Sequence, residues 1–145
     1  MGNVFSLIFA VLIGALTSIQ AAVNTELGKY VGSVTSTLIS FIAGTITIAI
    51  FYIILGEKGL GGVMKVPPYL LFGGVLGAIF VFGIIKVIPI IGVSSAMAGV
   101  IAGQLVLAMV IDHFGLFGAP IYRVGFHRII AAVLLFVSVN LMSSK

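Results

Sequence analysis

The side chains best suited to bind a ligand are amides and hydroxyls that lie inside long apolar stretches. Thr17, Gln20 and Asn24 are three and four residues apart, so a helix places them on one face. Ser40 and Gln104 are further polar side chains that could line the same kind of surface. No Asp or Glu lies in the middle of an apolar stretch, so these groups suit a small neutral, zwitterionic or amphipathic solute better than a strong cation. The alternative interpretation is that they form hydrogen bonds between helices.

Ionisable residues concentrate at one place, between the fourth and fifth apolar stretches. Histidine titrates near neutrality, so a carboxylate beside imidazoles at a membrane boundary could relay protons. Alternatively, Asp112 forms an ion pair with one of the two nearby arginines and anchors the loop, which is the interpretation we favour. The expected members of this boundary charge cluster are Asp112, His113, Arg123 and Arg128.

Several classes of function are excluded by what the sequence lacks. The chain has no Cys, no H-E-x-x-H or G-x-S-x-G pattern and no phosphate-binding loop. We therefore expect no catalytic residues, no metal site, no cofactor and no enzymatic activity. The net charge of +4 is too thinly spread to serve nucleic-acid binding.

The elements that must position these residues are membrane-spanning helices, because 61% of the 145 residues are hydrophobic and only 7% are charged. Charged residues leave uncharged stretches of 25, 27, 20, 25 and 16 residues, and a helix needs roughly 20 apolar residues to cross the hydrocarbon core. The predicted fold is an all-α membrane protein, a single transmembrane domain over residues 1–145. Its five predicted spans are 4–23, 34–55, 69–86, 91–111 and 124–142.

The limits of these spans follow the helix-breaking residues. Glycines and Pro67-Pro68 interrupt the chain after the second span, and Pro89 is expected to separate the third from the fourth. The fifth span has the shortest uncharged stretch and has Arg128 near its start, so a four-helix fold is the alternative. Glycines spaced for close helix packing are expected at Gly14, Gly44, Gly73, Gly77, Gly99 and Gly103.

The distribution of cations predicts two membrane orientations. With five spans the termini lie on opposite sides, and the cations divide four against three: Lys58, Lys65, Arg123 and Arg128 against Lys29, Lys86 and Lys145. Because Lys and Arg bias in short loops sets orientation, this near balance predicts insertion both ways round. Two oppositely inserted copies can then form an antiparallel homodimer, the relation between the halves of inverted-repeat transporters. The alternative is one orientation, set by the first helix or by a partner.

Five short strings of the sequence are distinctive when taken together, those at 19–24, 40–44, 72–77, 102–104 and 112–118. With them the chain resembles, over about residues 5–142, the YdcZ-type integral membrane proteins of bacteria, which are grouped with the drug/metabolite transporter superfamily. Motif positions of the family correspond to Gln20, Asn24, Gly44, Gly103, Gln104, Asp112 and Gly118.

The resemblance implies a five-helix half-unit of a ten-helix inverted-repeat transporter in the bacterial inner membrane. The expected function is transport of a small solute by alternating access as a dual-topology dimer, formed with a second copy or a paralogous subunit. The alternative is a non-transporting membrane scaffold or assembly partner. The resemblance names no substrate.

Overall fold

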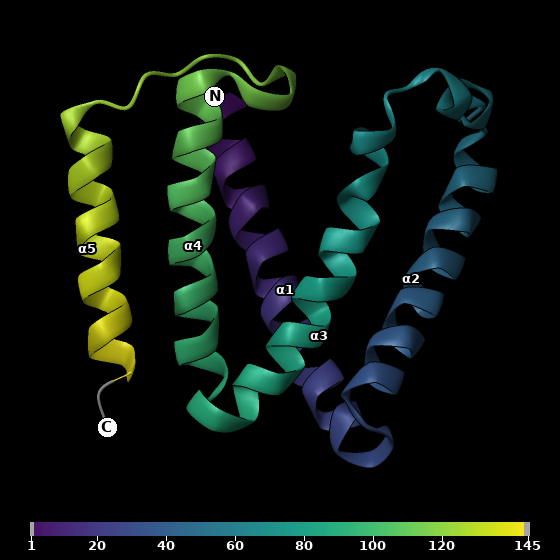
Figure 1. Cartoon of the computed structure of the whole chain (residues 1–145), viewed down its shortest axis with the longest axis horizontal. Coiled ribbons are helices and arrows are strands. Elements are labelled where there is room, and N and C mark those ends of the chain that lie inside the picture. The colour runs from purple at the N-terminus through teal and green to yellow at the C-terminus, as the bar shows by residue number, and fades with distance from the viewer. Residues whose placement is uncertain (1, 144–145) are drawn as a thin grey trace. The chain divides into compact units, whose positions relative to one another are not determined.

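The structure is a computed structural model that describes residues 2–143, with solvent exposure given for residues 4–142. It contains helices and no strand over the described residues (Figure 1), which confirms the all-α prediction. The five α-helices are α1 (Gly2–Val31), α2 (Ser33–Leu55), α3 (Gly73–Ile91), α4 (Val93–Phe114) and α5 (Phe126–Ser143). Three short 3₁₀ helices lie in the connections: η1 (Gly59–Lys65), η2 (Pro68–Phe72) and η3 (Leu116–Gly118).

Within residues 2–143, four helical segments are long and apolar enough to cross a membrane. They cover Val4–Val31, Ser33–Leu55, Pro68–Ile91 and Val93–Phe114, and a shorter apolar helix covers Phe126–Met142. At 1.5 Å per residue this fifth helix is about 26 Å long, slightly less than the hydrocarbon thickness. Four strong spans and one marginal one agree with the sequence prediction.

Contacts divide the described chain into two compact units, one ending at Pro89 and one beginning at Ile90. The expectation of a single transmembrane domain stays a prediction. In the first unit α1 and α2 form a close hairpin that reverses at Gly32, whose φ of 84° and ψ of 154° are open essentially only to glycine. The Gly32 N–H donates to the Gly28 carbonyl, and the Gly32 carbonyl accepts from the Ser36 N–H, so one residue ends α1 and starts α2.

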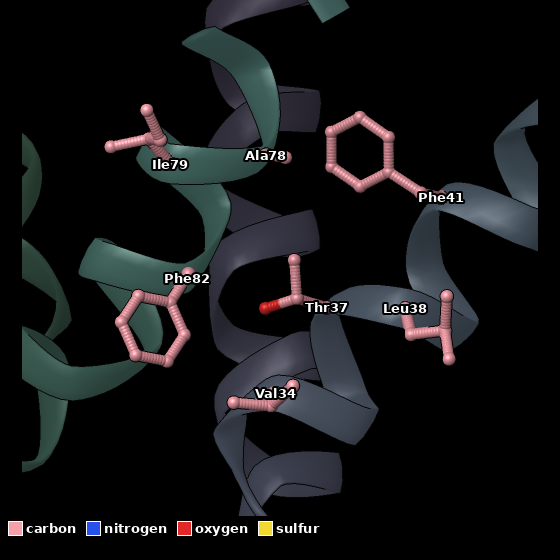
Figure 2. A pocket seen from close by; sticks show the side chains of 7 residues that line it. All are labelled: Val34, Thr37, Leu38, Phe41, Ala78, Ile79 and Phe82. Carbon is pink, nitrogen blue, oxygen red and sulfur yellow. The ribbon is translucent and has the colours of Figure 1, made fainter. Parts of the chain in front are cut away.

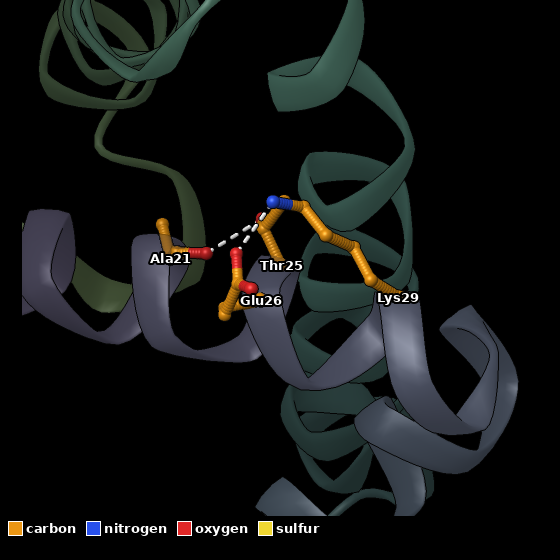
Figure 3. A network of polar contacts seen from close by, with 4 residues as sticks. All are labelled: Ala21, Thr25, Glu26 and Lys29. Carbon is orange, nitrogen blue, oxygen red and sulfur yellow. Dashed lines mark hydrogen bonds and ion pairs between the residues drawn. The ribbon is translucent and has the colours of Figure 1, made fainter.

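The predicted end of the first span at Val23 is wrong, because α1 continues to Val31. The polar residues after Val23 are compatible with a helix because their side chains bond locally (Figure 3). The Thr25 hydroxyl donates to the Ala21 carbonyl at 2.7 Å, and Lys29 pairs with Glu26 one turn away at 2.5 Å. The first glycine with positive φ is Gly32, and the helix ends there.

The expected break at Pro89 is also wrong. Pro89 lies in the last turn of α3, and the chain reverses three residues later at Gly92, with φ 82° and ψ 164°. Proline this close to a helix end removes one backbone hydrogen bond and need not stop the helix, whereas Gly92 supplies the conformation that does. The third span also begins earlier than its α-helix, since η2 leads directly into α3 at Gly73.

In the second unit α4 packs against α5. The buried hydroxyl of Ser95, near the start of α4, donates to the Met142 carbonyl near the end of α5 at 2.9 Å. At the other end, Gly115 caps α4 in the left-handed conformation and donates its N–H to the Ile111 carbonyl. The Ser95 contact joins the antiparallel pair at one end, and the Gly115 cap ends α4 at the other.

Most apolar side chains of the chain are exposed. The first half of α1, from Val4 to Thr17, is exposed throughout, and no residue of α2 beyond Phe41 is buried. Exposed apolar surface is expected of helices that face lipid or another membrane protein. Lys145, one of the cations in the charge balance, lies outside the described residues.

Candidate functional site

A buried polar contact joins α1 to α2. The Asn24 side-chain nitrogen Nδ2 donates to the Ser40 hydroxyl at 3.0 Å, and the Ser36 hydroxyl donates to the Asn24 backbone carbonyl at 2.6 Å. Asn24 is 6% exposed and Ser36 is fully buried. The structure therefore brings Asn24 and Ser40 together, and within this chain both serve as interhelical hydrogen-bonding groups.

Gly28 allows the helices to approach around this contact. A Cβ atom placed on Gly28 would lie 2.9 Å from Cγ2 of the buried Ile85 on α3 and 3.9 Å from Cβ of Ser36. Asn24 and Gly28 are one turn apart on α1, so the amide and the glycine belong to the same face. Thr25 and Thr37, which are also buried, donate to carbonyls of their own helices and leave the interhelical contact to Asn24, Ser36 and Ser40.

Thr17 and Gln20 lie on the part of α1 that the chain leaves exposed. The Thr17 hydroxyl donates to the Gly14 carbonyl at 2.7 Å. The Gln20 amide makes no hydrogen bond to any residue within 2–143. Gln20 is about four residues past the middle of α1, or roughly 5 Å along the helix axis, so this amide lies near the centre of the span.

Gln104 repeats this arrangement in the second unit. It is exposed and lies at the middle of α4, and its amide has no hydrogen-bond partner among the described residues. One and two turns later on α4, Ala108 and Asp112 line a pocket of about 220 Å³ between α4 and α5. The two unpartnered amides are thus each near the middle of their own span.

The boundary charge cluster forms at the end of α4. Arg128 donates to Asp112 with 3.1 Å between Nη1 and Oδ2, and its guanidinium lies 5.7 Å from the Tyr122 ring centroid. The Asp112 backbone carbonyl accepts from the Tyr122 N–H, and His113 Nδ1 accepts from the Val124 N–H at 3.2 Å. Arg123 is exposed and makes no ion pair within residues 2–143. Asp112, His113 and Arg128 together hold the loop between α4 and α5, which is the arrangement of an anchored loop.

Of the glycines expected to pack, only Gly77 has a neighbour near the position of an added Cβ, the Phe41 ring at 3.4 Å. The other five have open space within 4 Å in the chain as described: Gly14, Gly44, Gly73, Gly99 and Gly103. Their role in packing stays a prediction.

Sequence reasoning missed three residues that shape this region: Gly28, Thr25 and Ser95. Gly28 and Thr25 lay beyond the predicted end of the first span. The signal that could have included them is the four-residue spacing of Gly28 from Asn24 and of Thr25 from Ala21. Ser95 bonds to the end of α5, 47 residues further along the chain, a contact that the sequence pattern of α4 alone does not reveal.

Comparison with known proteins agrees with the membrane-spanning helices and the resemblance noted above. No curated protein and no solved structure matches the chain. Residues 5–141 match the model of the family described as "Putative inner membrane exporter, YdcZ", which covers all five α-helices. An exporter family is a class of transporter and not of enzyme. The chain is a multi-pass inner membrane protein that belongs to the YdcZ family.

Proposed function

We propose that this protein exports a small neutral, zwitterionic or amphipathic solute by alternating access, as an antiparallel dimer of two oppositely inserted copies. The observation that carries the proposal is the exposure of two amides, Gln20 and Gln104, near the middles of α1 and α4. Neither amide has a hydrogen-bond partner within residues 2–143.

An amide at this depth needs a polar partner. Moving an unpaired amide from water to an apolar medium costs roughly 2–7 kcal/mol. A second copy, a water-filled cavity or a bound solute could each supply the missing hydrogen bonds. A cavity enclosed between two copies would offer the amide a neighbouring copy, water and a bound solute as hydrogen-bond partners. Solute sites near the membrane midplane are typical of inverted-repeat transporters.

Small residues on α1 favour packing against a second copy. Ala10 and Gly14 are exposed and Ser18 is half-buried, and their four-residue spacing favours close packing between helices. The nearly equal division of cations between the two sides favours both orientations. An antiparallel pair would give the chain the symmetry that ten-helix relatives in such superfamilies obtain from two inverted halves.

The contacts of α1 support different roles for its polar residues. Asn24 is held by α2, which leaves Gln20 and Thr17 as the side chains of this face that another molecule can reach. Solute contact is therefore proposed for Gln20, Gln104 and Thr17, while Asn24 and Ser40 fix the shape of the hairpin that carries them.

Ligand-dependent thermal stability of the purified protein tests the proposal. The panel contains free amino acids, neutral sugars, short alkyl betaines and, as a strong cation, tetraphenylphosphonium. A solute at 100 times its Kd stabilises the folded state by about 2.7 kcal/mol. We expect a neutral, zwitterionic or amphipathic member to raise Tm in the wild type and in Ser138→Ala, whose hydroxyl bonds only to its own helix, but not in Gln20→Leu.

The active solute is then followed in proteoliposomes, where Gln20→Leu should abolish flux. Stabilisation by the cation alone would contradict the proposed solute class. A protein that no solute stabilises, and whose self-association is lost in Gln20→Leu, would instead be a non-transporting scaffold.

A further inference from the structure

An apolar groove runs between α2 and α3 in the first unit (Figure 2). Its volume is about 550 Å³, within the range of ligand-binding pockets, and the aromatic rings of Phe41 and Phe82 stand at its sides. The remaining lining is aliphatic apart from Thr37, whose hydroxyl already donates to the Ser33 carbonyl. The groove therefore offers an apolar occupant a large contact surface and no free hydrogen-bonding group.

A second, polar pocket of about 280 Å³ continues the groove towards the Gly32 turn. It is lined by Lys29 and Lys86 together with Ser33, the first residue of α2. The two pockets are adjacent, because Ser33 precedes the groove residue Val34 and Lys86 lies one turn after Phe82. The Lys86 ammonium also lies 5.8 Å from the Phe82 ring centroid, at the junction of the two.

The polar pocket carries a net positive charge. Lys29 is paired with Glu26, whereas Lys86 is exposed and has no carboxylate partner among residues 2–143. The start of α2 lines this pocket together with the ends of α1 and α3, so the helix dipoles oppose one another there and the net charge comes from Lys86. An anionic group is the complementary occupant.

The two pockets lie at the depths of a lipid headgroup and its chain. Lys29 lies in the last turn of α1 and Lys86 lies five residues before the end of α3, next to the start of α2, so this end of the unit is at headgroup level. From there the groove extends to Phe41, eight residues into α2, or about 12 Å along the helix axis. A charged site at the boundary with an apolar channel leading inward fits a molecule that has an anionic head and a long hydrocarbon tail.

We propose that an anionic phospholipid of the bilayer docks in this combined site. Its phosphate lies against Lys86 and the first turn of α2, and one acyl chain lies along the groove between Phe41 and Phe82. The lipid fills the space between α2 and α3 and stabilises α3 against the α1–α2 hairpin. This site is separate from the proposed solute site and does not depend on transport.

Titration of the delipidated protein with single lipids tests the proposal. Dioleoyl phosphatidylglycerol and dioleoyl phosphatidylcholine share acyl chains but differ in net charge, and glycerol phosphate supplies the anionic head alone. Thermal unfolding gives the apparent affinity, and native mass spectrometry counts the retained lipids. We expect phosphatidylglycerol to be retained and to raise Tm more than phosphatidylcholine, with no effect of glycerol phosphate.

Substitutions locate the effect. Lys86→Gln should weaken phosphatidylglycerol binding about fivefold, the effect of one lysine near a membrane surface, and remove the preference over phosphatidylcholine. The matched control Lys65→Gln removes an exposed lysine outside both pockets and should bind as the wild type does. Ala78→Phe, which places a ring in the groove, should weaken both lipids.

The proposal is overturned if the two lipids bind equally in the wild type, if Lys86→Gln and Lys65→Gln behave alike, or if glycerol phosphate stabilises as well as the intact lipid. Should Ala78→Phe fail to fold, the Lys86 and Lys65 pair still decides the result.

Discussion

The hydrogen bond between Asn24 and Ser40 predicts a measurable coupling between α1 and α2. The two side chains meet at 3.0 Å on helices that are otherwise joined at this level by Ser36 and by apolar contacts. Removing the Ser40 hydroxyl leaves the Asn24 amide without this acceptor at a site where only 6% of the residue is exposed. Leaving such a group unpaired costs about 1–3 kcal/mol, whereas the hydrogen bond itself contributes about 0.6 kcal/mol and at most about 1.7 in membrane helices.

The assay is a double-mutant cycle of Asn24→Ala and Ser40→Ala, with the free energy of unfolding measured in mixed micelles by circular dichroism. We expect each single variant to lose about 1–2 kcal/mol and the double variant to lose less than the sum, with a coupling energy of about 0.5–1.5 kcal/mol. The control pair Asn24→Ala and Ser138→Ala involves no contact and should be additive. A coupling energy of zero between Asn24 and Ser40 would refute the assignment of Asn24 to the hairpin and return it to the candidate solute-binding residues.

Two glycine substitutions test the helix contacts and turns. Gly28→Ala and Gly83→Ala gain the same intrinsic helix propensity, but only Gly28 faces Ile85. Gly28→Ala should therefore be less stable than Gly83→Ala by about 1–3 kcal/mol in the same unfolding assay. Equal stabilities of the two variants would argue against the contact. Gly92→Ala should lower the free energy of unfolding by about 1–3 kcal/mol relative to Gly83→Ala, because φ at Gly92 is 82°. This loss should be the same in every detergent, since backbone strain in a turn does not depend on a partner molecule.

The helices themselves could be predicted from the sequence because charge-free stretches long enough to span a bilayer leave no other way to satisfy the backbone. The precise ends could not. Val23 was predicted to end the first span, and polar residues follow it. These residues fit within α1 because the Thr25 hydroxyl bonds to the Ala21 carbonyl and Lys29 pairs with Glu26. Pro89 was expected to separate the third span from the fourth, whereas the turn is made by Gly92.

The candidate site was predictable as a set of residue types and not as a set of contacts. Thr17, Gln20 and Asn24 share a face in the sequence pattern, but the pattern is the same whether an amide meets a neighbouring helix or a solute. Only the position of α2 shows that Asn24 bonds to Ser40 and that Gln20 is left exposed. The same applies to Asp112, whose partner could have been either arginine until the loop placed Arg128 beside it.

The central claim, that copies of this chain insert in both orientations, is tested most directly by labelling one thiol from one side of the membrane. The chain has no native Cys. Gly61 lies in the connection between α2 and α3, where it is exposed and has open space around it. Gly61→Cys therefore introduces a single accessible thiol without changing the charge balance. We expect a membrane-impermeant maleimide to label about half of the copies in intact spheroplasts and the remainder only after permeabilisation. Labelling of all copies, or of none, before permeabilisation would show one orientation and contradict the antiparallel dimer.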